Sequence, residues 1–254
     1  MAGPATFNIK FAGKMKSIDS LLESTINKKM LVVFPHPDDE SVMAGGLIQR
    51  AMAGGYQVTV LTLTEGGRGK IHISGRGRSS VEIRRQEMAL AMSGLGVSDW
   101  IMWKFVDGKL RKTHRWKERL SEFIADTNPG LVVTYDLSGV SGHPDHISLS
   151  LEVLRTLKKL KNAKLLWVSF DEEHKQKMVD ERVGYLLQGP EYILDLSLGE
   201  SRRKWRSAFA HQSQNLRGYL KAPWWLLVIR SRAEWYSEAE FSRKYKYKFV
   251  KFKI

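Results

Sequence analysis

The chain of 254 residues contains no cysteine. This absence excludes disulfide bonds, a thiolate nucleophile and a zinc site with cysteine ligands, because each of these needs a sulfur atom. Histidine, aspartate and glutamate are then the strong metal ligands that remain available. The lack of cysteine does not by itself indicate a compartment.

Long hydrophobic runs are also missing. The longest strongly apolar run, Trp224–Ile229, is far shorter than the roughly 20 residues that a membrane-spanning helix needs. The first residues contain no continuous apolar region of the signal-peptide type. We therefore expect a cytoplasmic protein with no transmembrane helix.

Acidic residues are scarce only toward the C-terminus. Residues 1–200 carry 27 Lys and Arg against 24 Asp and Glu, whereas residues 201–254 carry 14 against 3. A basic segment of this kind attracts nucleic acid, anionic lipid or an acidic substrate, and it is also typical of a solvated basic face. The net charge of +14 is therefore mainly a property of the C-terminal end.

Buried-strand and amphipathic-helix patterns alternate along the chain. The patterns predict strands near residues 30–35, 57–63, 100–103, 131–135, 164–170 and 192–196. They predict helices near residues 18–26, 40–54, 81–93, 114–126, 144–161 and 199–213. Alternation of this kind indicates an α/β protein with a Rossmann-like, mostly parallel sheet and helices on both faces. We expect a lead with a short helix over 1–29, and one domain with a basic C-terminal extension over 30–254.

A cluster of ionisable side chains follows the first strand pattern. The apolar run 30–34 reads as a strand buried on both faces, and the segment 36–40 (His-Pro-Asp-Asp-Glu) comes directly after it. A helix then begins near Asp39 or Glu40. Open α/β sheets bind ligands at the carboxyl ends of their strands, and a His and a carboxylate on one tight turn can point at one cation. The alternative is an aspartate helix cap beside a surface histidine.

A second segment of the same kind occurs more than a hundred residues later. The segment 142–146 (Gly-His-Pro-Asp-His) follows the strand pattern 131–135 and precedes an amphipathic helix. Two His-Pro-Asp turns at the carboxyl ends of strands of one sheet can face each other across a crevice. The sequence therefore predicts a metal site at this edge of the sheet.

Together, the segments 36–40 and 142–146 closely resemble the motifs of the LmbE-like (PIG-L) family of zinc-dependent N-acetylglucosamine de-N-acetylases. Two further segments agree with this resemblance: 84–87 (Arg-Arg-Gln-Glu) looks like the family's Arg-x-x-Glu helix, and 211–214 (His-Gln-Ser-Gln) looks like its late His-x-Ser-Gln segment. The resemblance extends from about residue 30 to about residue 236. It implies a metal-dependent N-deacetylase.

The resemblance implies that His36, Asp39 and His146 are the metal ligands. Two imidazoles and one carboxylate suit Zn²⁺, with a fourth position left open for water. The same ligand types hold Fe²⁺ in non-haem iron sites, so Fe²⁺ or another divalent metal stays an alternative to zinc.

The resemblance also implies catalytic roles for three residues. Asp38 would be the general base that accepts a proton from water; the alternative is that Asp38 caps the following helix. His143 would stabilise the oxyanion as an imidazolium, and Asp145 would orient His143 and favour its charged form.

Three other residues, assigned to substrate contact, have weaker signals. Arg84 resembles the family's sugar-contacting arginine, although Arg85 beside it blurs the alignment. Glu65 either faces the crevice or lies in a solvated loop. His211 either reaches the site or caps the basic helix before it.

We expect the protein to remove the N-acetyl group from an N-acetylglucosamine-type sugar or conjugate, with release of acetate and a free amine. One alternative is a hydrolase of another amide or ester that uses the same metal centre. Another is a basic nucleic-acid-binding protein on this fold, although the sequence contains no helix-turn-helix, zinc-finger or RNA-binding signature.

The C-terminal end suggests a further partner. The pair Trp224–Trp225, within a basic segment, would dock on an anionic membrane surface; the alternative is that both tryptophans belong to the core. Pro223 fits the first turn of a short helix that holds them. The tail 245–254 alternates aromatic or apolar residues with lysine, which predicts an edge strand.

Overall fold

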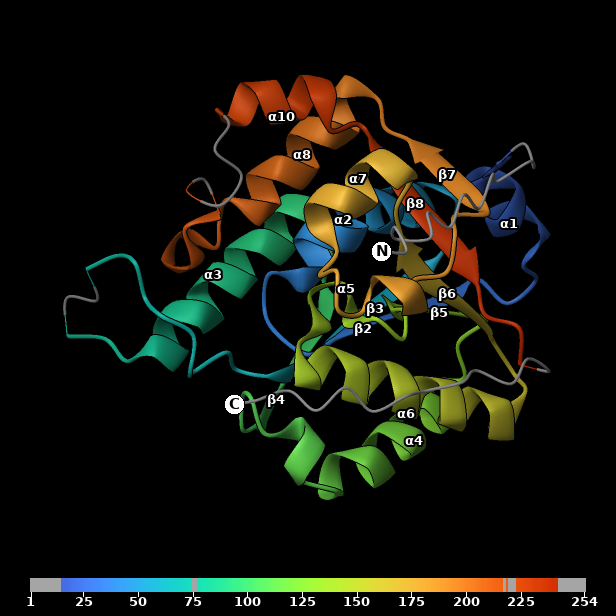
Figure 1. Ribbon diagram of the computed structural model, residues 1–254, viewed down its shortest axis with the longest axis horizontal. Helices are drawn as coiled ribbons and strands as arrows, with labels where there is room; N and C mark the ends of the chain where they lie inside the picture. Colours follow the sequence, from blue (N-terminus) through green and yellow to red (C-terminus); the bar gives the residue numbers. More distant parts are fainter. Residues whose placement is uncertain (1–14, 75–76, 217, 219–222, 242–254) are drawn as a thin grey trace, which may run out of the picture.

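The computed structural model describes residues 15–74, 77–216, 218 and 223–241, which form an eight-stranded sheet with helices on both faces (Figure 1). The strands are β1 (Lys16–Ser17), β2 (Lys29–Phe34), β3 (Gln57–Thr64), β4 (Asp99–Phe105), β5 (Leu131–Tyr135), β6 (Lys164–Ser169), β7 (Tyr192–Asp195) and β8 (Ala233–Glu238). The helices are α1 (Ile18–Ser24), α2 (Asp39–Ala53), α3 (Ser80–Leu95), α4 (Arg115–Thr127), α5 (Gly139–Gly142), α6 (Pro144–Leu160), α7 (Glu172–Met178), α8 (Leu198–Ala208) and α10 (Trp224–Arg230). Short 3₁₀ turns are η1 (Leu110–Lys112), η2 (Gly184–Leu186) and η3 (Gln212–Gln214).

The order of the strands creates the crevice that the sequence predicts. It runs β1-β7-β8-β6-β5-β2-β3-β4, and each pair is parallel except for β8, which is antiparallel to both of its neighbours. From β2 the chain proceeds to β3 and β4 on one side, and β5 and β6 then lie on the other side. The loops that follow β2 and β5 therefore diverge at a switch point, where α/β sheets bind ligands.

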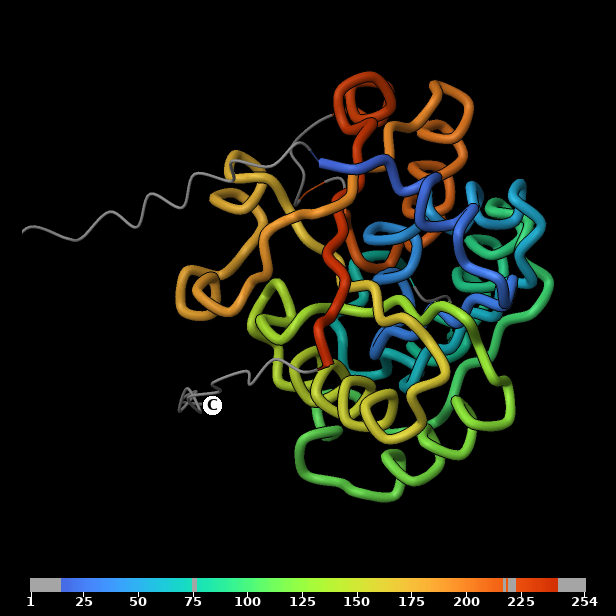
Figure 2. The backbone as a smooth tube through the Cα atoms, turned by 90° about the vertical axis from the view of Figure 1, so that its right-hand side faces the viewer, coloured from blue at the N-terminus to red at the C-terminus, as the bar shows by residue number. Residues whose placement is uncertain are grey.

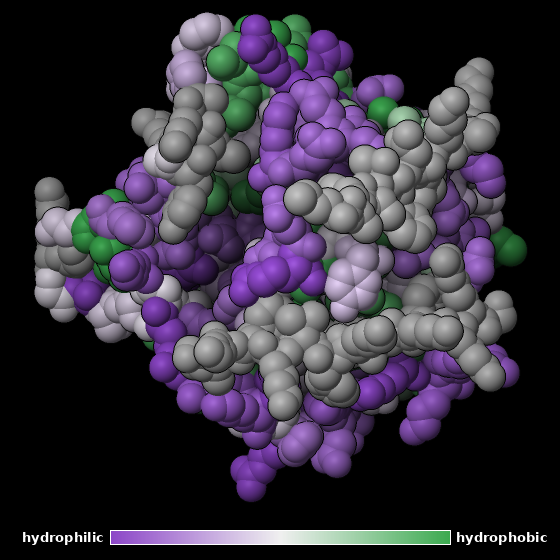
Figure 3. Space-filling model, viewed as in Figure 1, coloured by the Kyte–Doolittle hydropathy of each residue, from purple (hydrophilic) through white to green (hydrophobic). Residues whose placement is uncertain are grey.

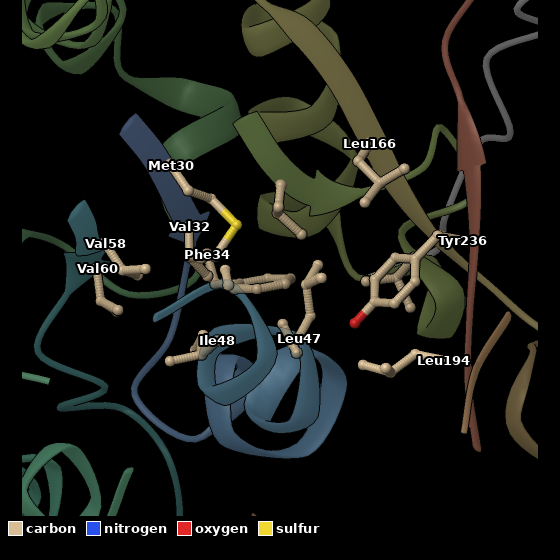
Figure 4. Packing of buried hydrophobic residues seen from close by; sticks show 14 of the residues in the cluster. Met30, Val32, Phe34, Leu47, Ile48, Val58, Val60, Leu166, Leu194 and Tyr236 are labelled. Atoms are coloured by element: carbon tan, nitrogen blue, oxygen red, sulfur yellow. The ribbon is translucent and has the colours of Figure 1, made fainter. Parts of the chain in front are cut away.

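Side chains of β2 pack on both faces of the sheet, which explains why this strand is apolar throughout. Met30, Val32 and Phe34 point to the face covered by α2 and α3 (Figure 4). Leu31 and Val33 point to the opposite face, which α4 and α6 cover. Two helical layers thus hold the strand, and its carboxyl end can position the turn that follows.

Two helices form an additional layer outside α2 and α3. Trp205 and Ala208 of α8 pack against Leu227 of α10. Both views place α10 at the outer edge of the molecule, with α8 between it and α2 (Figures 1 and 2). The helix α8 ends earlier than the sequence predicts, because the chain turns inward there and Ser213 donates two hydrogen bonds to Glu87 of α3.

The strand β8 is the main element that the sequence analysis missed. It inserts between β6 and β7, and its Glu234 is buried at 4% exposure. The Glu234 carboxylate accepts hydrogen bonds from the backbone N–H groups of Gly46 and Leu47, and Lys204 Nζ lies 2.7 Å from it. A buried glutamate obscures the apolar pattern of a strand, since its partners lie elsewhere in the sequence.

The ends of the chain differ in how far the structure describes them. Ile18, Leu21 and Leu22 of α1 pack into the same core as β2. Residues 1–14 of the predicted lead and the predicted tail strand 245–254 lie outside the described residues. Within the described ranges, we find no helix whose length and apolar character would allow it to cross a bilayer.

Candidate metal centre and active site

The turns after β2 and β5 bring the two sequence motifs together. After β5 the chain passes through α5 and enters α6 at Pro144, so that His146 lies in the first turn of α6. Gly139 has φ 59° and packs so closely that a Cβ atom there would lie 2.7 Å from His146 Cβ. This position requires glycine because both the backbone conformation and the close approach exclude a side chain.

Three predicted ligands converge on one point. His36 Nδ1 lies 3.2 Å from His146 Nε2, and Asp39 Oδ2 lies 3.5 Å from His36 Nδ1 and 3.8 Å from His146 Nε2. Two imidazole nitrogens and one carboxylate oxygen form a donor set that suits Zn²⁺ or Fe²⁺.

Asp39 and His146 are also held by contacts on the side away from the centre. Tyr135 donates a hydrogen bond of 2.6 Å to Asp39 Oδ1, and His146 Nδ1 lies 2.9 Å from the carbonyl oxygen of Gly139. Because the carbonyl can only accept, His146 carries its proton on Nδ1 and offers the Nε2 lone pair to the centre. The Tyr135 ring stacks on the His146 ring with centroids 4.3 Å apart. Outer contacts of this kind orient metal ligands in proteins, so the residues present fit a divalent metal.

Charge and burial set different protonation states for the three side chains. Burial lowers the pKa of His146 to about 4, which keeps its imidazole neutral at neutral pH. Burial opposes ionisation of Asp39, but His146 and His36 hold the pKa of Asp39 well below its ordinary value. Burial would lower the pKa of His36, but nearby carboxylates, Asp107 foremost, raise it well above the ordinary value. A cation bound here would displace the proton from His36.

Asp107 is a residue that the sequence analysis missed. Its Oδ1 lies 3.1 Å from His36 Nε2, on the side of the ring away from His146. Burial would raise the pKa of Asp107, but the nearby His36 lowers it to about 2, so this carboxylate is ionised. Asp107 lies two residues after β4. Its position just beyond the carboxyl end of a strand, like that of the carboxylates after β2 and β5, is the sequence signal that would have identified it.

Asp38 occupies a strained turn between β2 and α2. Its φ of 118° and ψ of −31° are unusual for a residue with a side chain. The Asp38 N–H donates to Glu40 Oε2 at 3.1 Å, and Arg84 donates to the carbonyl oxygen of Pro37. The Asp38 side chain forms no capping hydrogen bond with α2, so the helix-cap interpretation is wrong. Strain of this kind is typical of functional sites.

The environment of Asp38 suits proton transfer. Burial raises the pKa of Asp38 to about 6, while Arg84 opposes the shift with Nη1 3.6 Å from Asp38 Oδ2. A carboxyl group with this pKa is mostly ionised at neutral pH and still basic enough to accept a proton.

His143 lies beside the ligands, but its partners differ from those implied by the resemblance. Its ring centroid lies 4.9 Å from that of His36 and 5.0 Å from that of His146. Burial and the charge of His36 lower the pKa of His143, so the implied imidazolium is not favoured by these surroundings. The backbone N–H of Asp145 donates to His143 Nδ1 at 3.2 Å, which places the ring proton on Nε2.

The Asp145 carboxylate has a different partner from the one expected. It is fully buried and accepts hydrogen bonds from the backbone N–H groups of Gly108 and Leu110, and its Oδ2 lies 3.5 Å from His36 Nε2. Asp145 therefore holds the loop after β4 and the rear of His36, and it orients His143 through its backbone.

The three residues assigned to substrate contact lie at different depths. Arg84 is buried at 2% exposure beneath the first turn. Glu65 forms an ion pair with Arg85, which is half exposed on α3. His211 is buried, with Nε2 3.5 Å from Glu40 Oε1, and it caps neither α8 nor η3. His211 therefore reaches the underside of the site and does not cap the basic helix.

The fold and the donor set define an α/β protein with clustered His and Asp side chains that could hold a divalent metal. A family model described as PIG-L: GlcNAc-PI de-N-acetylase matches residues 31–157. The chain belongs to the PIG-L family.

Proteins with similar sequences are consistent with membership of this family. The 1D-myo-inositol 2-acetamido-2-deoxy-alpha-D-glucopyranoside deacetylase of Geodermatophilus obscurus is 32% identical over an alignment of 161 residues, and the match covers 52% of this chain and 54% of that protein. The chain thus spans about half the length of the curated relatives it matches.

Solved structures show the same fold. The N,N'-diacetylchitobiose deacetylase of Pyrococcus horikoshii has a TM-score of 0.63 at 19% identity, and the match covers 91% of this chain and 96% of that one. The 4-carboxy-2-hydroxymuconate hydratase GalB of Pseudomonas putida KT2440 has a TM-score of 0.56 at 17% identity, over 88% of this chain and 100% of that one. The fold thus occurs with more than one reaction, and the reaction must be argued from the site.

Proposed function

We propose that the protein is a metal-dependent hydrolase that removes the N-acetyl group from an N-acetylglucosamine-type sugar or conjugate. The observation that carries this proposal is the convergence of His36 Nδ1, Asp39 Oδ2 and His146 Nε2, with the ionised Asp38 beside them. The deacetylase relative of Geodermatophilus obscurus supports the amino-sugar substrate class.

His36, Asp39 and His146 would hold a divalent metal, whose chemistry would be to acidify a water molecule and polarise the amide carbonyl. Asp38 accepts the proton of the attacking water, because its carboxylate adjoins Asp39 and is not engaged in capping α2. The same proton can then pass from Asp38 to the nitrogen of the departing amine, which leaves acetate and a free amino sugar.

His143 supplies the hydrogen-bond donor for the developing oxyanion. Since Nδ1 accepts from the Asp145 backbone, Nε2–H is the donor, and a neutral imidazole suffices for this role. Donors of this kind typically contribute a factor of roughly 10²–10³ in rate. Asp107 and Asp145 keep the rear of His36 fixed while the reaction proceeds.

The first test measures acetate release from N-acetylglucosamine conjugates, including the inositol conjugate and diacetylchitobiose. It compares metal-stripped protein, protein reloaded with Zn²⁺ or Fe²⁺, and the reloaded Asp38→Asn variant. We expect metal-dependent release that falls by at least roughly 10²-fold in Asp38→Asn, while metal content stays unchanged.

Three outcomes contradict parts of this proposal. Failure of the chain to bind a metal would remove the mechanism. Metal binding without acetate release from any sugar, but with hydrolysis of another amide or ester, would assign the site to that other substrate class. Faster turnover with Fe²⁺ than with Zn²⁺ would overturn zinc as the metal; one solved structure of this fold is the zinc-inhibited form of teicoplanin deacetylase Orf2.

A further inference from the structure

The helix α10 exposes large apolar side chains to solvent. Trp224 is 44% exposed, Trp225 is 53% exposed and Ile229 is 56% exposed, whereas Leu227 is buried against α8. Leu227 thus anchors the helix on α8, and the two tryptophans and Ile229 remain exposed to solvent. The interpretation of both tryptophans as core residues is wrong. Figure 3 shows apolar side chains at the top of the molecule, where α10 lies.

A groove adjoins this helix. It has a volume of about 750 Å³ and is lined by residues of α3 and α8 and by Trp224 of α10. Its lining combines the exposed Leu90 of α3 with three arginines of α8, Arg202, Arg203 and Arg206. The groove therefore combines apolar and cationic side chains.

Three arginines near α10 carry charge that no carboxylate among the described residues neutralises, whereas Lys204 pairs with Glu234. Residues 201–232 contain eight Lys and Arg and no Asp or Glu. Arg203 donates to the Gln49 side chain, and among the residues that the structure describes no carboxylate pairs with Arg202, Arg203 or Arg206. Among the described residues, Arg202, Arg203 and Arg206 share the lining of the groove with Trp224, so their positive charge lies beside an exposed tryptophan.

We propose that this face docks the protein on an anionic lipid bilayer. The docking surface consists of Leu90, Arg202, Arg206, Trp224, Trp225 and Ile229. Indole rings favour the interface between water and acyl chains, and arginines at the same level pair with anionic headgroups. Exposed Ile229 and Leu90 gain from burial in acyl chains, whereas they would gain nothing from the phosphates of a nucleic acid. The charge and the apolar side chains together favour a bilayer as the partner.

The docking surface also lies next to the catalytic region. The groove shares Phe209 and Gln212 with a smaller cavity of about 300 Å³, which His211 lines. His211 in turn contacts Glu40 below the first metal turn. Docking would therefore bring the bilayer to the side of the proposed active site where His211 and Glu40 lie. The inference goes beyond the proposed function, since docking does not depend on which bond the site cleaves.

The test is sedimentation of the full chain with vesicles of phosphatidylcholine alone, or of phosphatidylcholine mixed with phosphatidylglycerol. We expect binding to the anionic vesicles only, weakening as salt is added. Trp224→Ser/Trp225→Ser and Arg202→Glu/Arg206→Glu should each lower the vesicle affinity by at least roughly 10-fold.

Two matched variants control for nonspecific effects. Ile26→Ser/Leu160→Ser removes exposed apolar side chains elsewhere, and Lys158→Glu/Lys159→Glu makes the same charge change at the end of α6. Both should keep vesicle affinity within about 2-fold of the unmodified chain. Circular dichroism melting of every variant confirms that the fold is retained.

Several results would overturn the inference. If Lys158→Glu/Lys159→Glu lowered vesicle affinity as much as Arg202→Glu/Arg206→Glu, net charge alone would explain the attraction. Absence of binding to anionic vesicles at low salt would remove the docking surface. Salt-sensitive binding of RNA or DNA, without binding to vesicles, would show that the basic surface binds nucleic acid instead of a bilayer. These outcomes are separable from failure of deacetylation, because the readout is vesicle binding.

Discussion

Two adjacent arginines, Arg84 and Arg85, illustrate how burial assigns different roles to identical side chains. Arg84 lies beneath the turn of Asp38, where it donates to the Pro37 carbonyl, and Arg85 pairs with Glu65 in solvent-accessible surroundings. A buried cation beside a buried carboxylate is costly to remove, because the carboxylate then has no counter-charge. An exposed ion pair contributes little, since water and salt screen it.

We therefore predict that Arg84→Met lowers the free energy of unfolding by about 3 kcal/mol, whereas Arg85→Met changes it by less than about 0.5 kcal/mol. Urea denaturation of both variants beside the unmodified chain provides the measurement. Similar losses in the two variants would show that Arg84 does not support the turn of Asp38.

The connection between β5 and α6 is the element that completes the site. At Gly139 an added Cβ would also lie 3.1 Å from the Ile147 backbone nitrogen, so the start of α6 would have to move. Gly55 offers a matched comparison: its φ is 82°, but an added Cβ there would meet no atom within 4 Å. Both glycines have left-handed backbone, and close packing distinguishes them.

We predict that Gly139→Ala weakens metal binding by at least roughly 10-fold, because His146 is displaced from His36 and Asp39. Gly55→Ala should leave metal affinity unchanged and lower stability by only about 1 kcal/mol through backbone strain. Titration of the metal-stripped variants with Zn²⁺ checks this. Unchanged affinity in Gly139→Ala would contradict the role assigned to the close packing.

Three helices are joined by one arginine. Arg50 of α2 donates to Asp19 of α1 at 2.8 Å and to Glu200 of α8 at 2.9 Å. Burial would raise the pKa of Glu200, but hydrogen bonds from Arg50 and Ser197 lower it from its ordinary value of 4.5 to about 2. A lowered carboxyl pKa stabilises the fold above pH 4.5, and this contribution is lost as the pH falls toward 2.

Glu200→Gln should therefore lower the free energy of unfolding by about 1 kcal/mol at pH 7, after allowance for solvent screening, and the difference should vanish near pH 2. Thermal melting of both proteins across this pH range provides the measurement. Glu173→Gln, which removes an exposed pair with Lys177, is the control and should melt like the unmodified chain. If Glu200→Gln were still less stable than the unmodified chain near pH 2, the loss of stability would come from packing and not from charge.

At the scale of the whole molecule, the buried pair Lys204–Glu234 connects the outer helical layer to the sheet. Glu234 of β8 also accepts from the backbone of α2, so that three elements far apart in the sequence share one carboxylate. Both side chains are almost fully buried. Removal of either charge leaves the other one unpaired in the interior.

We predict that Lys204→Met lowers the free energy of unfolding by about 3–5 kcal/mol, and that Lys204→Met/Glu234→Gln recovers part of this loss because no lone charge remains. Chemical denaturation of the single and double variants provides the measurement. A double variant less stable than the single one would show that Glu234 acts mainly through its backbone hydrogen bonds.

The sequence predicted those parts of the molecule that local patterns encode. The apolar run of β2 and the helical spacing of α2 depend on neighbouring residues, so their positions were predicted to within about two residues. The strand β8 and the buried Glu234 were missed, since their partners Lys204 and Gly46 are distant in sequence. Asp107 was missed for the same reason, because it becomes relevant only where β4 ends near His36.

The sequence by itself determined the donor types, the two turns that carry them and their position at the carboxyl ends of strands, because spacing and hydrophobic pattern are local properties. Only the tertiary structure decided which side chains meet. It placed His36, Asp39 and His146 within 4 Å of one another, buried Arg84 under Asp38, and left Trp224 and Trp225 in solvent. The physical reason is that burial and long-range contact depend on how strands pair and helices pack.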